Sequence, residues 1–330
     1  MSDSPLRPPW PPNGPIRVGR KLLVHYAGGS PFGWHRCESF AVCNRLYAFK
    51  RAGWDLNESL DALIVGGLVH TGLGQLYAIQ GLSRVGSRVQ VLGEWFQGSS
   101  ARDAFYMPAE AVEIAGQLTD APDALVLFAK GIVEQYVGAK GAGDYAQMET
   151  VGIEVPIEVQ FAPDLPPYTM LVDWLVRDAT GTLTPWDHKT SSHPQMRLVE
   201  EYAMSGQFTG HVHGLQVLAK GAPFKLPHVN VVGKTAHYTG LRSEVPITKP
   251  MIAEFPSFVA QRQRRILAQE QAMPPKDNPY AWEPRWSGGS GDGCRNRYRM
   301  CGARDLCRQG AGSPHAEEAQ QGKLWSPERA

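Results

Sequence analysis

The spacing of apolar and polar residues changes from helical to strand-like and back along the chain. Residues 57–80 are almost continuously apolar and predict a buried helix, and Asp55 and Glu58 give it a capping-box-like start. Residues 120–141 predict a second helix that ends at a glycine. Helical patterns therefore precede the strand-like patterns that follow.

Three strand-like segments come next in the sequence. They cover residues 152–161, 169–178 and 183–191. The turn sequence Ala-Thr-Gly joins the second segment to the third, so these two are expected to form a hairpin. The elements predicted after the hairpin are a helix from Pro194 to Gly221, a strand over residues 228–233 and a helix around residues 250–270. This order predicts a mixed α/β fold, with a mixed central sheet flanked by helices.

Composition limits the domain organisation but does not identify a partner. With 42% hydrophobic residues, a chain of 330 residues can bury a sizeable core. Residues 1–16 are rich in proline and residues 311–330 lack apolar periodicity, so both are expected to be flexible extensions of one domain over residues 17–310. The formal net charge of +1 neither favours nor excludes nucleic acid as a partner.

The expected compartment follows from apolar runs and cysteine usage. No apolar run of about 18 residues stands out and the N-terminus lacks a hydrophobic signal core, so we expect no membrane span and a cytoplasmic location. The five cysteines are Cys37, Cys43, Cys294, Cys301 and Cys307. An odd number of thiols in a reducing compartment favours metal or cluster ligation over a disulfide framework.

Two aspartates and a lysine lie on the predicted hairpin. Asp173 interrupts an apolar strand, where a carboxylate is costly unless it is paired or bound to a metal. Asp187 and Lys189 lie two apart on the next strand and point to the same face. Two carboxylates on adjacent strands favour a hard divalent cation such as Mg²⁺ or Mn²⁺ between them, with the ammonium alongside. The alternative interpretation is a solvated surface ion pair.

Several polar residues near this hairpin have equally simple structural interpretations. His70 lies late in the predicted buried helix, and it could be a core histidine or a metal ligand. Glu154 and Glu158 on the preceding strand are typical of a solvated strand face. Gln207 lies on the helix that follows the hairpin, where it could simply make that helix polar.

Taken together, these segments resemble the RecB-like branch of the PD-(D/E)XK nuclease superfamily. The motifs are "GGLVH" at residues 66–70, "LVDWLVRDATGTLTPWDHKTS" at residues 171–191 and "SGQFTGH" at residues 205–211. The resemblance implies a restriction-endonuclease-like core and a metal-dependent deoxyribonuclease.

The same resemblance implies a role for each matching residue. The implied metal ligands are His70, Asp173, Asp187 and the carbonyl oxygen of His188. Lys189 is implied as the catalytic lysine, and Gln207 as an active-site helix residue that holds substrate or lysine. The chain departs from the pattern at His211, which stands where the family has a tyrosine.

The cysteines provide a second, independent pattern. Cys294, Cys301 and Cys307 are closely spaced, and a four-thiolate site needs a distant fourth ligand, for which Cys43 is the candidate and Cys37 the rival. Zinc sites normally show shorter pairs with two to four residues between the cysteines, which this stretch lacks, but zinc and thiols without metal stay open as alternatives. The split pattern resembles iron–sulfur members of the same superfamily, namely AddB-type repair nucleases, CRISPR adaptation nucleases and phage exonucleases. It implies a [4Fe–4S] cluster that staples the chain ends together.

The implied substrate is single-stranded or frayed DNA, in recombination, repair or phage DNA processing. A nucleotide-binding loop is not expected, because His228 occupies the position where a P-loop needs glycine. A helicase or recombination partner would therefore be a separate protein. Two alternatives stay open: an iron–sulfur DNA-binding or adaptor protein that does not cleave, and a nuclease stapled by zinc.

Overall fold

The chain forms two compact units in a computed structural model that describes residues 10–12, 14–25, 30–54, 61–235, 237–275, 278–282, 295–296, 299–300, 314 and 317. The sheet unit comprises the described residues of Met1–Pro31, Asp61–Gln160 and Pro167–Phe255. The helical unit comprises those of Phe32–Leu60, Phe161–Pro166 and Pro256–Ala330. All the residues of the predicted metal site fall within the sheet unit.

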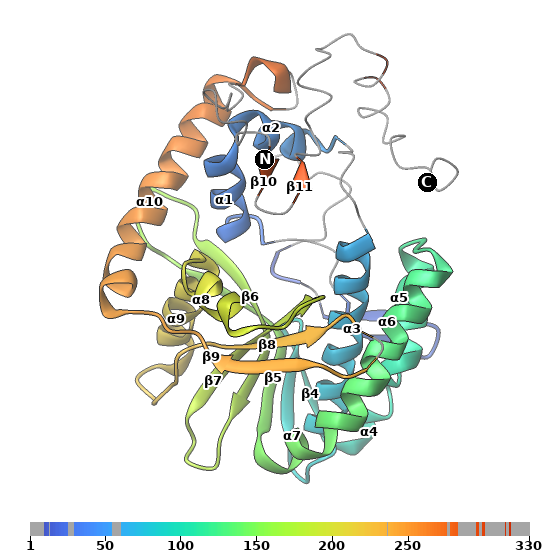
Figure 1. Ribbon diagram of the computed structural model, residues 1–330. Coiled ribbons are helices and arrows are strands. Elements are labelled where there is room, and N and C mark those ends of the chain that lie inside the picture. The colour runs from blue at the N-terminus through green and yellow to red at the C-terminus, as the bar shows by residue number, and fades with distance from the viewer. Residues whose placement is uncertain are drawn as a thin grey trace. The chain divides into compact units, whose positions relative to one another are not determined.

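The sheet unit contains a seven-stranded mixed sheet in the order β4-β3-β5-β6-β7-β8-β9 (Figure 1). These strands are β3 (Arg88–Val91), β4 (Glu94–Gln97), β5 (Glu149–Val159), β6 (Tyr168–Arg177), β7 (Leu183–Ser191), β8 (His228–Gly233) and β9 (Gly240–Glu244). β3 runs parallel to β5 and β7 runs parallel to β8, whereas the other neighbours are antiparallel. The predicted mixed α/β class with a mixed central sheet is therefore confirmed.

Helices cover both faces of this sheet. α3 (Asp61–Leu82) lies on one face, with α5 (Pro108–Leu118) and α6 (Asp123–Tyr136) packed against it, and α8 (Met196–Ala203) and α9 (Gly206–Ala219) lie on the other (Figure 1). β8 shows this division directly. Val232 joins the core around α3, while Val231 packs with the α8 and α9 side chains. Successive strand residues point to opposite faces, so each face has its own core.

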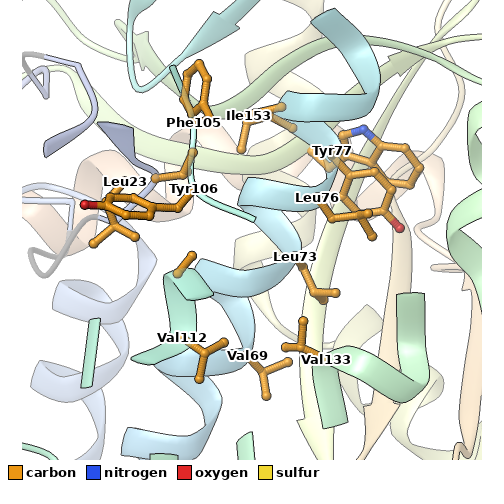
Figure 2. Close-up of a cluster of buried hydrophobic side chains, with 14 of the residues drawn as sticks. Leu23, Val69, Leu73, Leu76, Tyr77, Phe105, Tyr106, Val112, Val133 and Ile153 are labelled. Carbon is orange, nitrogen blue, oxygen red and sulfur yellow. The ribbon is translucent and has the colours of Figure 1, made fainter. Parts of the chain in front are cut away.

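α3 is apolar around most of its circumference because neighbouring elements enclose it. Figure 2 shows Val69 and Leu73 of this helix beside Val112 of α5 and Val133 of α6. A Cβ atom added at Gly72 would lie 2.7 Å from a methyl carbon of Val133, so the glycine permits close packing. By length and composition α3 could cross a membrane, but 61% of its apolar window is buried inside the protein.

Short elements connect the main layers of the sheet unit. They are β1 (Ile16–Val18), β2 (Lys21–Leu23), α4 (Gly98–Arg102), the π-helix η1 (Val137–Gly141) and α7 (Ala142–Gln147). The helix predicted over residues 120–141 is present as α6 and η1. It does not stop at Gly141, because α7 continues directly from that residue.

The helix predicted from Pro194 to Gly221 is wrong as one element. The chain breaks it between α8 and α9, where the side chain of Ser205 accepts a hydrogen bond from the backbone N–H of Gln207. A serine at this position favours starting a new helix over continuing the old one. The three predicted strands of the meander are present as β5, β6 and β7, and the capping-box residues Asp55 and Glu58 lie outside the described residues.

The helical unit packs around a small aromatic core. Its elements are α1 (Trp34–Val42), α2 (Asn44–Ala52), the part of α10 (Lys249–Ala272) from residue 256 onwards, the 3₁₀-helix η2 (Pro279–Ala281), β10 (Arg295–Asn296) and β11 (Arg299–Met300). Phe40, Tyr47 and Trp282 pack together in this core. Glu270 of α10 accepts hydrogen bonds from Arg36 and Tyr47, which ties α10 to α1 and α2.

Candidate active site at a fork in the sheet

The two central strands separate where the predicted site residues begin. β6 and β7 pair only from Trp174 opposite Trp186 to Arg177 opposite Leu183. Beyond Trp174, β6 continues to pair with β5, and beyond Trp186, β7 continues to pair with β8. The register places Asp173 opposite Asp187 at the first position after the ladder ends. The strands therefore form a fork with a carboxylate on each branch.

A backbone N–H, an imidazole and a second carboxylate lie close to the carboxylate of Asp173. The backbone N–H of His188 donates to Asp173 Oδ2 at 2.7 Å, and His70 Nδ1 lies 3.4 Å from the same oxygen. Glu154 lies opposite Asp173 on β5, between the pairs flanking that position. One ligand atom from each of His70, Glu154 and Asp173 lies within 4.8 Å of the other two. An imidazole and two carboxylates at this spacing can share one divalent cation.

Glu154 is the site residue that the sequence pattern did not single out. Its φ angle is +48°, a left-handed conformation that is strained for a residue with a side chain. Such strain persists only where the surrounding structure imposes it, and it is concentrated at functional sites. Glu158 matches the predicted solvated strand face, since it is exposed and accepts a hydrogen bond from Trp10.

The second carboxylate of the fork is engaged by a lysine and an amide. Lys189 Nζ lies 2.5 Å from Asp187 Oδ1, and Gln207 Nε2 donates to Asp187 Oδ2 at 2.5 Å. Gln207 Oε1 accepts from Lys189 Nζ at 3.3 Å. The three side chains thus form a closed triangle that joins β7 to α9. In this arrangement the amide of Gln207 fixes both the acid and the ammonium.

Burial and mutual repulsion perturb the carboxylates. The pKa of Glu154 is raised to about 7, first by burial and then by Asp187. The pKa of Asp173 is raised well above its ordinary value by burial, with Asp187 and Glu154 adding to the shift. The ammonium of Lys189 acts to lower both pKa values but does not outweigh burial and repulsion, and a bound cation would add further positive charge.

The pKa values of the two basic groups, His70 and Lys189, shift in opposite directions. Burial, with the nearby ammonium of Lys189, lowers the pKa of His70 to about 4, so its imidazole is neutral at pH 7 and available as a ligand. Burial acts to lower the pKa of Lys189 as well, but Asp187 and Asp173 outweigh it and leave that pKa above its usual value. Lys189 is therefore a cation beside the donor cluster.

The structure brings together all the residues that sequence motifs placed in the site. His70 comes from α3, Asp173 from β6, and Asp187, the backbone of His188 and Lys189 from β7, while Gln207 comes from α9. His211, at the family's tyrosine position, is only 1% exposed. Its side chain belongs to the interior behind Gln207 and does not reach solvent.

The two described cysteines differ in their surroundings. Cys37 is 2% exposed in the aromatic core of the helical unit, where burial raises the pKa of its thiol to about 11. Cys43 lies at the junction of α1 and α2, and its sulfur accepts from the backbone N–H of Leu46 at 3.5 Å. The predicted cluster ligands Cys294, Cys301 and Cys307 lie outside the described residues.

Comparison with known proteins shows no family for this chain. No protein-family model matches the sequence, and no curated protein shows significant sequence similarity to it. A crystal structure from Eubacterium rectale, of a protein that carries the name putative exonuclease, matches over 84% of this chain and 87% of that one. The identity is 12% and the TM-score is 0.44. At that level of similarity the function of this chain has to be argued from its own site.

Proposed function

We propose that the protein is a metal-dependent nuclease that hydrolyses phosphodiester bonds in DNA. The observation that carries this proposal is the convergence at the fork, where the donor atoms of His70, Glu154 and Asp173 lie within 4.8 Å of one another. A half-buried lysine ammonium belongs to the same site through Asp187. A structural ion pair needs neither the neutral imidazole nor a second and third carboxylate.

Each side chain has a distinct task in this proposal. Asp173, Glu154 and His70 would hold Mg²⁺ or Mn²⁺, with Asp187 and the carbonyl of His188 as further oxygen donors. The cation supplies an activated water and offsets charge on the scissile phosphate. Lys189 orients the attacking water or stabilises negative charge as it develops on the phosphate. Gln207 holds the side chains of Lys189 and Asp187 in place through its two hydrogen bonds.

The substrate assignment rests on the sequence motifs of the RecB-like branch. They support DNA ends, single-stranded or frayed, in recombination, repair or phage DNA processing, with any helicase supplied by a partner. A DNA-binding protein without cleavage is the second candidate. The ion pair between Lys189 and Asp187 argues against it, because a protein that only binds DNA has no need to hold a half-buried lysine beside three acids.

Substitution of the lysine tests the proposal. Purified wild-type protein with Mn²⁺ is expected to degrade an end-labelled single-stranded oligonucleotide, and Lys189→Ala to lose about 100-fold or more of that rate. Lys189→Ala should still bind Mn²⁺, because the proposed ligands remain. Lys130→Ala removes an ammonium that pairs with Glu113 away from the fork, and it should cut at the wild-type rate. A wild type that cuts nothing, or a Lys189→Ala variant that cuts equally well, would contradict the proposal.

We also propose a [4Fe–4S] cluster ligated by Cys43, Cys294, Cys301 and Cys307. The split cysteine spacing in the sequence supports it. Cys43 is the candidate for the distal ligand and Cys37 is its rival, and both thiols are buried. Zinc at the same thiols is the alternative, and metal analysis of protein purified without oxygen distinguishes the two.

A further inference from the structure

A second polar cluster lies on the opposite face of β7 from Asp187 and Lys189. Its members are Tyr77, Tyr136, Asp144, His188, Asn230 and Arg242. His188, Asn230 and Arg242 are directly paired across β7, β8 and β9, so they form one polar row over three strands. The proposed reaction uses none of the cluster's side chains. The backbone of His188 reaches the fork, and its ring packs edge-on against the ring of His70, with centroids 6.1 Å apart.

Hydrogen bonds along this row have a fixed direction. Arg242 donates to both carboxylate oxygens of Asp144, at 2.5 and 2.7 Å, and its Nε donates to Asn230 Oδ1 at 3.2 Å. Because an arginine only donates, the carbonyl of Asn230 must face Arg242 and its amide must face His188. Asn230 Nδ2 then donates to His188 Nδ1 at 2.9 Å. The charge pair at one end thus sets the hydrogen-bond role of His188 at the other.

Aromatic packing fixes the same imidazole from the side of α3. The Tyr77 ring lies nearly parallel to the His188 ring, with centroids 5.6 Å apart and an interplanar angle of 8°. Tyr77 also stacks on Trp174 at 3.7 Å and donates its hydroxyl hydrogen to Asp144 Oδ2 at 2.8 Å. The plane and the rotation of the His188 ring are therefore both determined by this cluster.

We propose that this buried cluster is a positioning device for the metal ligands, and that Asn230 is the residue through which it acts. His188 presents its two sides to different environments: its ring to the cluster, and its backbone to the fork. The backbone N–H holds Asp173 Oδ2 at 2.7 Å, and the backbone of the same residue contacts His70. Fixing the His188 ring fixes the peptide units that orient both ligands.

Stability alone gives a weak reason for such a cluster. A buried ion pair such as Arg242 with Asp144 contributes little more than well-packed apolar residues of similar volume would. The arrangement also leaves His188 Nε2 buried without a hydrogen-bond partner among the described residues, which is itself destabilising. Orientation of the metal ligands explains why the polar residue Asn230 lies between Arg242 and His188. Residues that orient metal ligands raise metal affinity by about 10–100-fold.

The inference rests on the proposed function, so its test measures Mn²⁺ affinity and stability separately. Asn230→Leu keeps a similar size but removes both the acceptor for Arg242 and the donor to His188. It is expected to weaken Mn²⁺ binding about tenfold or more. Tyr136→Phe is the matched control, because it removes bonds to Arg242 and Asn230 but leaves the Asn230–His188 contact. Thermal unfolding of each metal-free variant reports the structural loss alone. Asn230→Ala replaces Asn230→Leu if the latter does not fold.

The outcomes separate the inference from the function. Weak Mn²⁺ binding by the Asn230 variant, with near-wild-type binding by Tyr136→Phe at a similar melting temperature, supports the positioning role. Equal affinities in all three proteins, or an equal loss in both variants, overturn it while the nuclease proposal stands. A wild type that binds no Mn²⁺ overturns both.

Discussion

At the residue scale, Glu154 gives the clearest electrostatic prediction. Its pKa of about 7 lies above the ordinary value, so the folded state binds more protons than the unfolded state between these two values. The free energy of unfolding of the metal-free protein should therefore fall as pH rises through that window. Asp173, with its own raised pKa, contributes in the same direction.

Glu154→Gln removes one of these acids. We predict that the metal-free variant melts at a higher temperature than the wild type at about pH 8 and shows a shallower decline from about pH 5. Glu158→Gln changes an exposed glutamate on the same strand, and its pH profile should follow the wild type. Melting curves across this pH range provide the measurement, and a Glu154→Gln profile as steep as that of the wild type would refute the assignment.

At the scale of elements, the approach of α3 to its neighbours makes a testable prediction. A Cβ atom at Gly72 would lie 2.7 Å from Val133 and 3.0 Å from Val112, so Gly72→Ala should destabilise the protein by about 1–2 kcal/mol through overpacking. Gly67 on the same helix has no such neighbour within 4 Å. Gly67→Ala should instead stabilise by about 0.5–1 kcal/mol. Denaturant unfolding of both variants measures these changes in stability. Equal stabilisation by both substitutions would mean that α3 packs less closely against Val133 and Val112 than the structure shows.

The elements also show how far the sequence could be interpreted. Residues 183–191 were predicted as a strand and form β7 with those limits, because a hairpin with clear turn residues is encoded locally. Glu154 and Glu158 share one strand face, so only the location of the fork distinguishes the site acid from the exposed one. The pairing of Asn230 with His188 depends on strands distant in sequence, and no local pattern specifies that register.

At the scale of the whole molecule, the proposed cluster would join residue 43 to residues 294–307. Removing Cys43 should therefore release iron and lower the melting temperature, because a long-range crosslink restricts the unfolded chain. Cys43→Ser, purified without oxygen, is expected to be colourless and free of iron. Cys37→Ser is the control and should keep its iron. Loss of iron from Cys37→Ser alone, or zinc in the wild type, would contradict this prediction.

The fork also gives the site a mechanical property. β6 with β5 and β7 with β8 form two ribbons that share hydrogen bonds only along the four residue pairs from Trp174–Trp186 to Arg177–Leu183. A small twist of one ribbon against the other changes the gap between Asp173 and Lys189 without breaking any ladder bond. The hydrogen bond from the backbone N–H of His188 to the Asp173 carboxylate spans the fork, so it should limit how far the two ribbons separate at the site.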